Sequence, residues 1–251
     1  MRSLYAATAV ALMTTTAAPF AAGAQTLPAS NPFAQPSTLP YQAPAFDRIK
    51  DADYLPAIKA GMAQQRQEIA AITRQRSMPT FDNTIAALEK SGRLLARANM
   101  TFDALNGANT NPVLQKTEEE LAPLMAAHAD AINLDPQLFA RVKSLYDRRD
   151  TLGLDAERMM VLTVTYQNMV RAGAQLSATD QQALRAINGQ LSTLETSFRQ
   201  HLLAAAKANA LVVDDKAKLA GLSDAEIAAA ATAANERGLP GKYMLPLQNT
   251  T

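Results

Sequence analysis

The sequence contains no cysteine and no tryptophan, and aromatic residues make up only 5% of its 251 residues. Without cysteine the chain can form no disulfide, no thiolate metal site and no cysteine nucleophile. Glycine occurs ten times, whereas alanine is abundant. This composition is typical of a helical protein, and it argues against a β-sandwich or a βαβ repeat.

The chain also lacks an excess of charge of either sign. It contains 24 basic and 23 acidic residues, and the basic residues form no block. A net charge near zero argues against nucleic acid or an anionic membrane as the main partner. We therefore expect no nucleic-acid binding.

The first 24 residues are expected to be a cleavable signal peptide. Arg2 supplies the positive charge, residues 4–13 supply a short apolar run, and small residues precede a cut after Ala24. The apolar run is too short for a stable bilayer anchor, so we expect no stable membrane insertion. The alternative is a buried N-terminal helix. Export to the periplasm follows from the signal-peptide interpretation.

The rest of the chain divides into three parts. Residues 25–46 carry a proline at every fourth position from Pro28 to Pro44, which excludes a helix and predicts an extended arm. A recognition segment for a proline-binding domain is the alternative. Residues 47–210 are expected to form a helical domain, and residues 211–251 the truncated start of a next subdomain.

Within this layout the hydrophobic spacing predicts an all-α fold of antiparallel helical hairpins. We expect Pro56 to lie in the first turn of its helix and Pro123 to kink its helix. The expected helices run from about 53 to 76, from 84 to 105, from 112 to 132, from 136 to the stop at 153, from 155 to 173, from 177 through a long apolar stripe, and from 223 to 238.

The long helix after Ser177 carries the clearest apolar stripe. Its members recur at spacings of three and four and are Leu184, Ile187, Leu191, Leu194, Phe198 and Leu202. The run Leu211–Val213 predicts a strand or an extended piece. The segment 242–247 also predicts an extended piece, one that the sequence leaves without a closing turn or partner strand.

Few side chains suggest chemistry. The two histidines, His128 and His201, lack the spacing that places two imidazoles around zinc, and both are expected to be ordinary helix residues. The run Glu118-Glu119-Glu120 cannot converge on one metal, because consecutive helical residues point in different directions. It is expected to be a solvated helix face.

The pair Asp214-Asp215 follows the predicted extended run, where a turn with helix-capping duty is expected and a paired-carboxylate site is the alternative. The sequence therefore assigns no catalytic residue, no cofactor-binding residue and no metal ligand. Taken alone, the residues predict an exported helical domain and leave its chemistry open.

An ordered series of segments gives further information, because it resembles a known family. The segments are FDRI at 46–49, YLPAI at 54–58, PTFDNTIAALE at 79–89, SG at 91–92, ELAP at 120–123, RAGAQL at 171–176, LAGLS at 219–223 and LPLQNTT at 245–251. In order and spacing the series resembles the N-terminal part of bacterial peptidyl-dipeptidases, in the thimet-oligopeptidase and oligopeptidase A family of zinc metallopeptidases. The resemblance covers residues 31–251.

The resemblance implies a helical enzyme of about 700 residues that is split by a deep channel and cleaves short unstructured peptides. It also implies a zinc ion, bound by a His-Glu-x-x-His helix and a downstream glutamate, that activates a water molecule. Neither has a counterpart in residues 1–251. We therefore expect the inactive N-terminal part of an exported zinc peptidyl-dipeptidase, which by itself binds no zinc. The alternative is a non-enzymatic periplasmic scaffold or binding protein.

Overall fold

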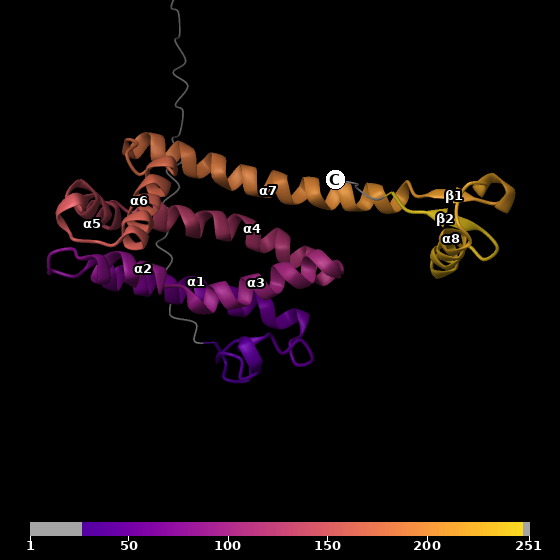
Figure 1. Cartoon of the computed structure of the whole chain (residues 1–251), viewed down its shortest axis with the longest axis horizontal. Coiled ribbons are helices and arrows are strands. Elements are labelled where there is room, and N and C mark those ends of the chain that lie inside the picture. Colours follow the sequence, from indigo (N-terminus) through magenta and orange to yellow (C-terminus); the bar gives the residue numbers. More distant parts are fainter. Residues whose placement is uncertain (1–26, 248–251) are drawn as a thin grey trace, which may run out of the picture.

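The computed structural model describes residues 27–247. This part of the chain is mostly helical, with one two-stranded antiparallel sheet (Figure 1), and the predicted fold class is confirmed. The elements in chain order are α1 (Asp51–Thr73), the π-helical turn η2 (Phe81–Ala86), α2 (Ala87–Glu89), α3 (Arg93–Ala108), α4 (Pro112–Asn133), α5 (Pro136–Asp147), α6 (Ala156–Arg171), α7 (Ala178–Ala208), β1 (Leu211–Val213), α8 (Asp224–Glu236) and β2 (Tyr243–Leu245).

Side-chain caps define most helix starts. The Asn111 carboxamide oxygen accepts hydrogen bonds from the backbone N–H groups of Val113 and Leu114, directly before α4. Asp135 caps α5 in the same way, and a capping box between Ser223 and Glu226 opens α8. These caps satisfy N–H groups that have no partner inside the helix. The predicted starts of these helices are confirmed.

The helix expected from 84 to 105 is wrong as one continuous element. The chain instead forms η2 and α2, breaks at Lys90-Ser91-Gly92, and resumes as α3. Gly92 has a left-handed backbone with φ of 71°, which a residue with a Cβ atom rarely adopts. The side chain of Gln65 also fills the space that such a Cβ would need. The break is therefore built into the packing of α1 against this region.

Two prolines lie inside helices. Pro56 is the sixth residue of α1, so the expectation that it lies in the first turn is wrong. It costs the helix one hydrogen bond, because proline has no N–H to donate to the carbonyl four residues earlier. Pro123 lies inside α4, which continues as one helix to Asn133.

The proline-rich arm is described from residue 27 onward, and it is anchored by Phe33. That ring is 3% exposed and lies 5.5 Å, centroid to centroid, from the ring of Tyr54 in α1. Arg97 of α3 donates a hydrogen bond to the Phe33 carbonyl oxygen at 2.8 Å. Tyr41 and Phe46, two further aromatic residues of the segment, are exposed. Of the three aromatic rings of the arm, the ring of Phe33 is the one buried against the helices.

Two apolar clusters form the core, and α1 contributes to both. The first lies where the arm, α1, α3 and α4 meet, and it contains Tyr54, Ile58, Phe102 and Leu114. The second lies where α1 meets η2, α5 and α6, and it includes Ile69. Two groups of buried residues on α1, one before residue 63 and one after residue 68, thus support both ends of the helical body.

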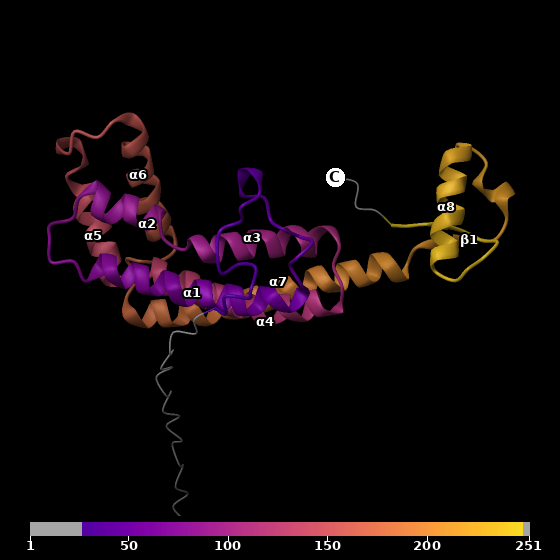
Figure 2. The ribbon, with the colours of Figure 1, turned by 90° about the horizontal axis from the view of Figure 1, so that it is seen from below.

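The C-terminal residues form a small separate layer. Strand β1 pairs with β2 in antiparallel register, with Val212 opposite Met244, and α8 packs against β2. Figure 2 shows this unit at the far end of α7, away from the other helices. The strand expected at 211–213 is confirmed, whereas the expectation that the extended segment lacks a partner strand is wrong. The signal peptide predicted for residues 1–24 lies outside the described residues.

A close backbone approach between α1 and α3 gives a stability prediction. A Cβ added at Gly61 of α1 would lie 2.6 Å from both the Cα and the backbone nitrogen of Leu95 in α3. We expect Gly61→Ala to lower the free energy of unfolding by about 1–3 kcal/mol, because the two helices must move apart. Urea denaturation followed by circular dichroism measures the change.

The matched control is Gly189→Ala in α7, where an added Cβ meets nothing within 4 Å. This variant is expected to raise the free energy of unfolding by about 0.5–1 kcal/mol, since alanine has the higher helix propensity. Equal effects of the two substitutions would contradict the close approach of α1 and α3.

Candidate functional site along helix α7

Helix α7 packs against α4 through its polar and small side chains. Asn188 donates a hydrogen bond to the Asp130 carboxylate at 2.8 Å, and Gln200 donates one to the Gln115 carbonyl oxygen at 3.2 Å. Thr196 is the one buried residue of α7, at 2% exposure. The interface with α4 is thus held largely by hydrogen bonds.

The predicted apolar stripe of α7 faces the other way. Five of its members are between 49% and 67% exposed, namely Ile187, Leu191, Leu194, Phe198 and Leu202. Thr196 lies five residues after Leu191, so the two point about 140° apart around the helix. These five apolar side chains therefore lie on one side of α7, but within the described residues they do not pack into a core.

A pocket of about 340 Å³ lies where the end of α3 and the start of α4 meet α7. Arg199 forms a salt bridge of 2.9 Å with Glu118, which also accepts a hydrogen bond from Asn106. The pKa of Asp103 is raised, first by burial and then by the negative charge of Glu118, whereas the hydrogen bond from Asn99 lowers it. The full lining is Asp103, Asn106, Gly107, Thr110, Gln115, Glu118, Arg199, Gln200 and Leu203.

This arrangement can bind a polar group but offers little chemistry. Its guanidinium already pairs with one of its two carboxylates, and its remaining polar groups are amides and a hydroxyl. Sequence reasoning missed Asp103 and Arg199, because the lining comes from three helices and no local motif joins it. A second hollow, of about 450 Å³, follows along α7 and is lined by Leu202, Leu203, Leu247 and neighbouring residues.

The acidic candidates separate as expected. Glu118 pairs with Arg199 of α7, whereas Glu120 pairs with Lys59 of α1, so the run links two different helices. Glu119 is exposed. The prediction that the three carboxylates cannot converge is confirmed, but the solvated-face interpretation is wrong for Glu118, whose side chain is only 21% exposed.

The pair Asp214-Asp215 takes the capping role. Asp215 accepts a hydrogen bond from the backbone N–H of Ala217 at the start of a 3₁₀ turn, and Asp214 pairs with Lys218. The turn with capping duty is therefore confirmed, and the paired-carboxylate alternative finds no support in this geometry.

The two histidines lie in different surroundings. His128 of α4 is buried at 4% exposure, and its Nε2 lies 2.7 Å from the carboxamide oxygen of Gln65 in α1. This contact makes Nε2 the protonated nitrogen, and it leaves the buried Nδ1 without a partner. His201 is exposed on α7, near Ser197. Across residues 27–247, no three His, Asp or Glu side chains are grouped as a metal site would require.

Comparison with known proteins identifies the relatives of this chain. It is 48% identical to dipeptidyl carboxypeptidase of Escherichia coli over 221 residues, which are 88% of this chain and 32% of that protein. The chain is homologous to part of a dipeptidyl carboxypeptidase. The enzyme of that name from Salmonella typhimurium is 46% identical over 222 residues, and Escherichia coli oligopeptidase A is 24% identical over 212 residues. No family model matches the chain.

The chain spans about one third of the length of the dipeptidyl carboxypeptidases that it matches. The predicted resemblance to peptidyl-dipeptidases and oligopeptidase A is confirmed, and these homologues are peptidases by name. None of the helices in residues 27–247 combines the length and the apolar character that crossing a membrane requires.

The surroundings of His128 generate a pH prediction. Burial, with a smaller contribution from the charge of Arg66, lowers the pKa of His128 from its ordinary value near 6.5 to about 4. The unfolded chain therefore binds a proton at this side chain at higher pH than the folded chain does. We expect the free energy of unfolding to be highest above pH 6.5 and to fall as the pH drops from 6.5 toward 4.

The variant His128→Gln should weaken this pH dependence, and His201→Gln, at an exposed position, should leave it unchanged. Urea denaturation midpoints between pH 4 and pH 7 measure the effect. Equal pH profiles for the His128→Gln variant and the parent would contradict it.

Proposed function

We propose that the chain supplies a helical wall of an exported zinc peptidyl-dipeptidase, an enzyme that removes C-terminal dipeptides from short unstructured peptides. The observation that carries the proposal is the 48% identity to Escherichia coli dipeptidyl carboxypeptidase over 88% of this chain. Identity to oligopeptidase A is half as high, at 24%. That difference favours the dipeptide-releasing branch over its oligopeptidase relatives.

The role proposed for these helices is steric. Helices α1, α3 and α4 share one apolar cluster, and the arm is fixed to it by Phe33, so this part can act as a firm wall. Such a wall beside a channel would admit an extended peptide and exclude a folded protein. The specificity for short peptides would then arise from access to the channel and not from a binding residue in this chain.

The residues described do not fit the zinc ion that the resemblance implies. His128 is engaged by Gln65 inside the helical body, and no grouping of three His, Asp or Glu occurs within residues 27–247. The metal ligands, the general base and the oxyanion donors would belong to the part of the peptidase that has no counterpart here. This chain would contribute no proton transfer.

Export is part of the proposal. The support is the signal-peptide pattern of residues 1–24, with a cut after Ala24 and a periplasmic destination. A chain without cysteine folds independently of the disulfide machinery of that compartment.

A chimera tests the proposed activity. In it, this chain replaces the matched 221-residue segment of Escherichia coli dipeptidyl carboxypeptidase. We expect the chimera to release C-terminal dipeptides from an N-terminally blocked peptide, and a chelator to stop the reaction. Mass spectrometry of the products is the measurement. The chain from residue 25 to 251 alone is expected to bind no stoichiometric zinc and to release no dipeptide.

The matched control places the same segment in Escherichia coli oligopeptidase A, where the lower identity predicts poor packing and little activity. A folded first chimera that releases no dipeptide would contradict the proposal. So would chelator-sensitive dipeptide release by the chain alone.

A further inference from the structure

The exposed stripe of α7 is long, continuous and uncharged. From Ile187 to Leu202 it extends about 22 Å along the helix axis at 1.5 Å per residue. The five exposed members of the stripe are all apolar, and Phe198 is the most exposed of them, at 67%. A patch of this kind on a folded body marks a surface that a partner covers. Aromatic residues are also enriched among the side chains that dominate binding at interfaces.

The contacts of α7 with α4 keep its apolar side exposed. The polar side of the helix already meets α4 through Asn188, Arg199 and Gln200. Rotating the helix to bury the stripe against α4 would break these hydrogen bonds and remove Thr196 from its buried position. The helix is therefore held with its apolar side outward, ready for a second surface.

The few charges of the helix limit the kind of partner that could cover the stripe. A helix that binds a lipid surface carries many lysine or arginine residues on its polar face. In α7 the basic residues are Arg185, Arg199 and Lys207, and Arg199 is paired with Glu118. An uncharged stripe instead suits the apolar surface of another folded protein part.

The size of the relatives and the path of the chain identify that part. The matched residues make up 32% of Escherichia coli dipeptidyl carboxypeptidase, so about two thirds of that protein has no counterpart in this chain. Leu247 lines the same hollow as Leu202 and Leu203, at the C-terminal end of the stripe. The polypeptide thus returns from the β1–β2 sheet to the side of α7.

We propose that the stripe of α7 is the docking surface for the remaining two thirds of the peptidase, with Phe198 and Leu194 as its central contacts. This inference rests on the proposed function, because it takes the partner from the same family of enzymes. It assigns α7 a double role. Its polar side belongs to this wall, and its apolar side joins the wall to the rest of the enzyme.

Thiol labelling in the chimera tests the proposal, and the absence of cysteine from this chain makes it direct. Leu194→Cys reports whether the stripe is accessible to solvent. Thr193→Cys, at an exposed neighbouring position on the same helix, is the matched control. Each variant is prepared both in the 251-residue chain and in the chimera. Labelling with a maleimide is measured on the peptide that contains the substituted position.

In the free chain we expect both thiols to react at similar rates. In the chimera the Leu194→Cys thiol should react at least about tenfold more slowly than in the free chain, because interface cores exclude solvent. The Thr193→Cys thiol should keep its rate within about twofold, because Thr193 points about 100° around the helix from Leu194 and lies outside the stripe. Equal labelling of Leu194→Cys in the two proteins would overturn the proposal, even if the chimera releases dipeptides.

Protection without dipeptide release would support the docking surface while contradicting the proposed function. Slow labelling of Leu194→Cys in the free chain that becomes fast on dilution would show a second copy on the stripe and overturn the proposal. If the chimera fails to fold, co-expression of the chain with the unmatched part of the Escherichia coli enzyme replaces it. Co-purification should then be lost in Phe198→Glu and kept in Thr193→Glu, and the reverse or an absence of co-purification would overturn the proposal.

Discussion

The burial of α1 along most of its length is the constraint on which the helical body depends. Tyr54 and Ile58 lie in one apolar cluster, and Ile69 and Ile72 lie in the other, so this single helix joins two cores. Its close approach to α3 requires glycine at position 61. Every element that contributes to the wall, from the arm to α6, is positioned directly or indirectly by contacts with this helix.

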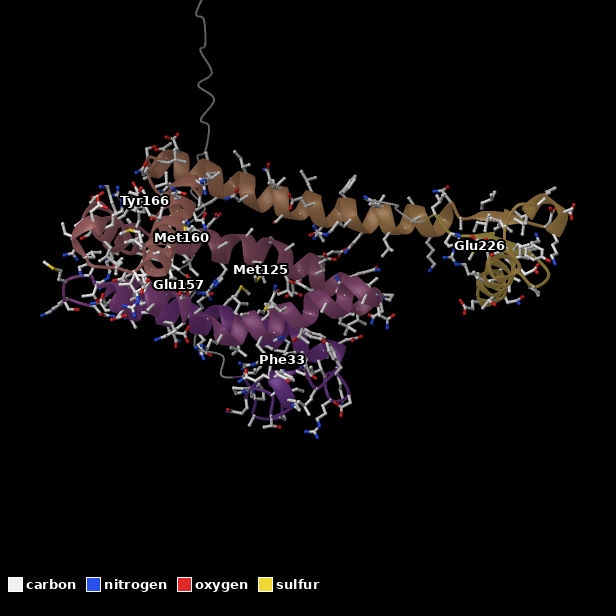
Figure 3. All side chains as sticks on the ribbon, in the orientation of Figure 1. Phe33, Met125, Glu157, Met160, Tyr166 and Glu226 are labelled. Atoms are coloured by element: carbon white, nitrogen blue, oxygen red, sulfur yellow. The ribbon has the colours of Figure 1, made fainter. Side chains whose placement is uncertain are left out.

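Helix α7 follows a different rule. It is the longest helix described, and it lies beside α4 (Figure 1). One residue of it is buried, and polar contacts hold it to α4. Figure 3 shows side chains standing out along the side of α7 that faces away from the body. Net stabilisation by a hydrogen bond is about 0.5–1.5 kcal/mol, whereas full burial of a leucine or phenylalanine gives about 1.5–3 kcal/mol. Burial of the exposed apolar side chains of α7 would therefore stabilise the helix more than its present hydrogen bonds do.

Local signals in the sequence predicted the parts of the fold that local forces decide. Caps such as Asn111 and Ser223 determine where helices begin, and the apolar run at 211–213, with two β-branched valines, forms its strand. The break at Gly92 was missed because it depends on Gln65 of another helix. The pairing of β2 with β1 and the pocket around Arg199 were missed for the same reason: each joins residues far apart in the chain.

The stripe of α7 shows what hydrophobic periodicity does and does not say. Spacings of three and four indicate that one side of a helix is apolar, but they do not identify the surface that covers it. Here the neighbouring helix α4 takes the opposite side. The proposed docking surface starts from this exposed apolar side. The comparison supports it, because the homologous enzymes are about three times as long as the matched segment.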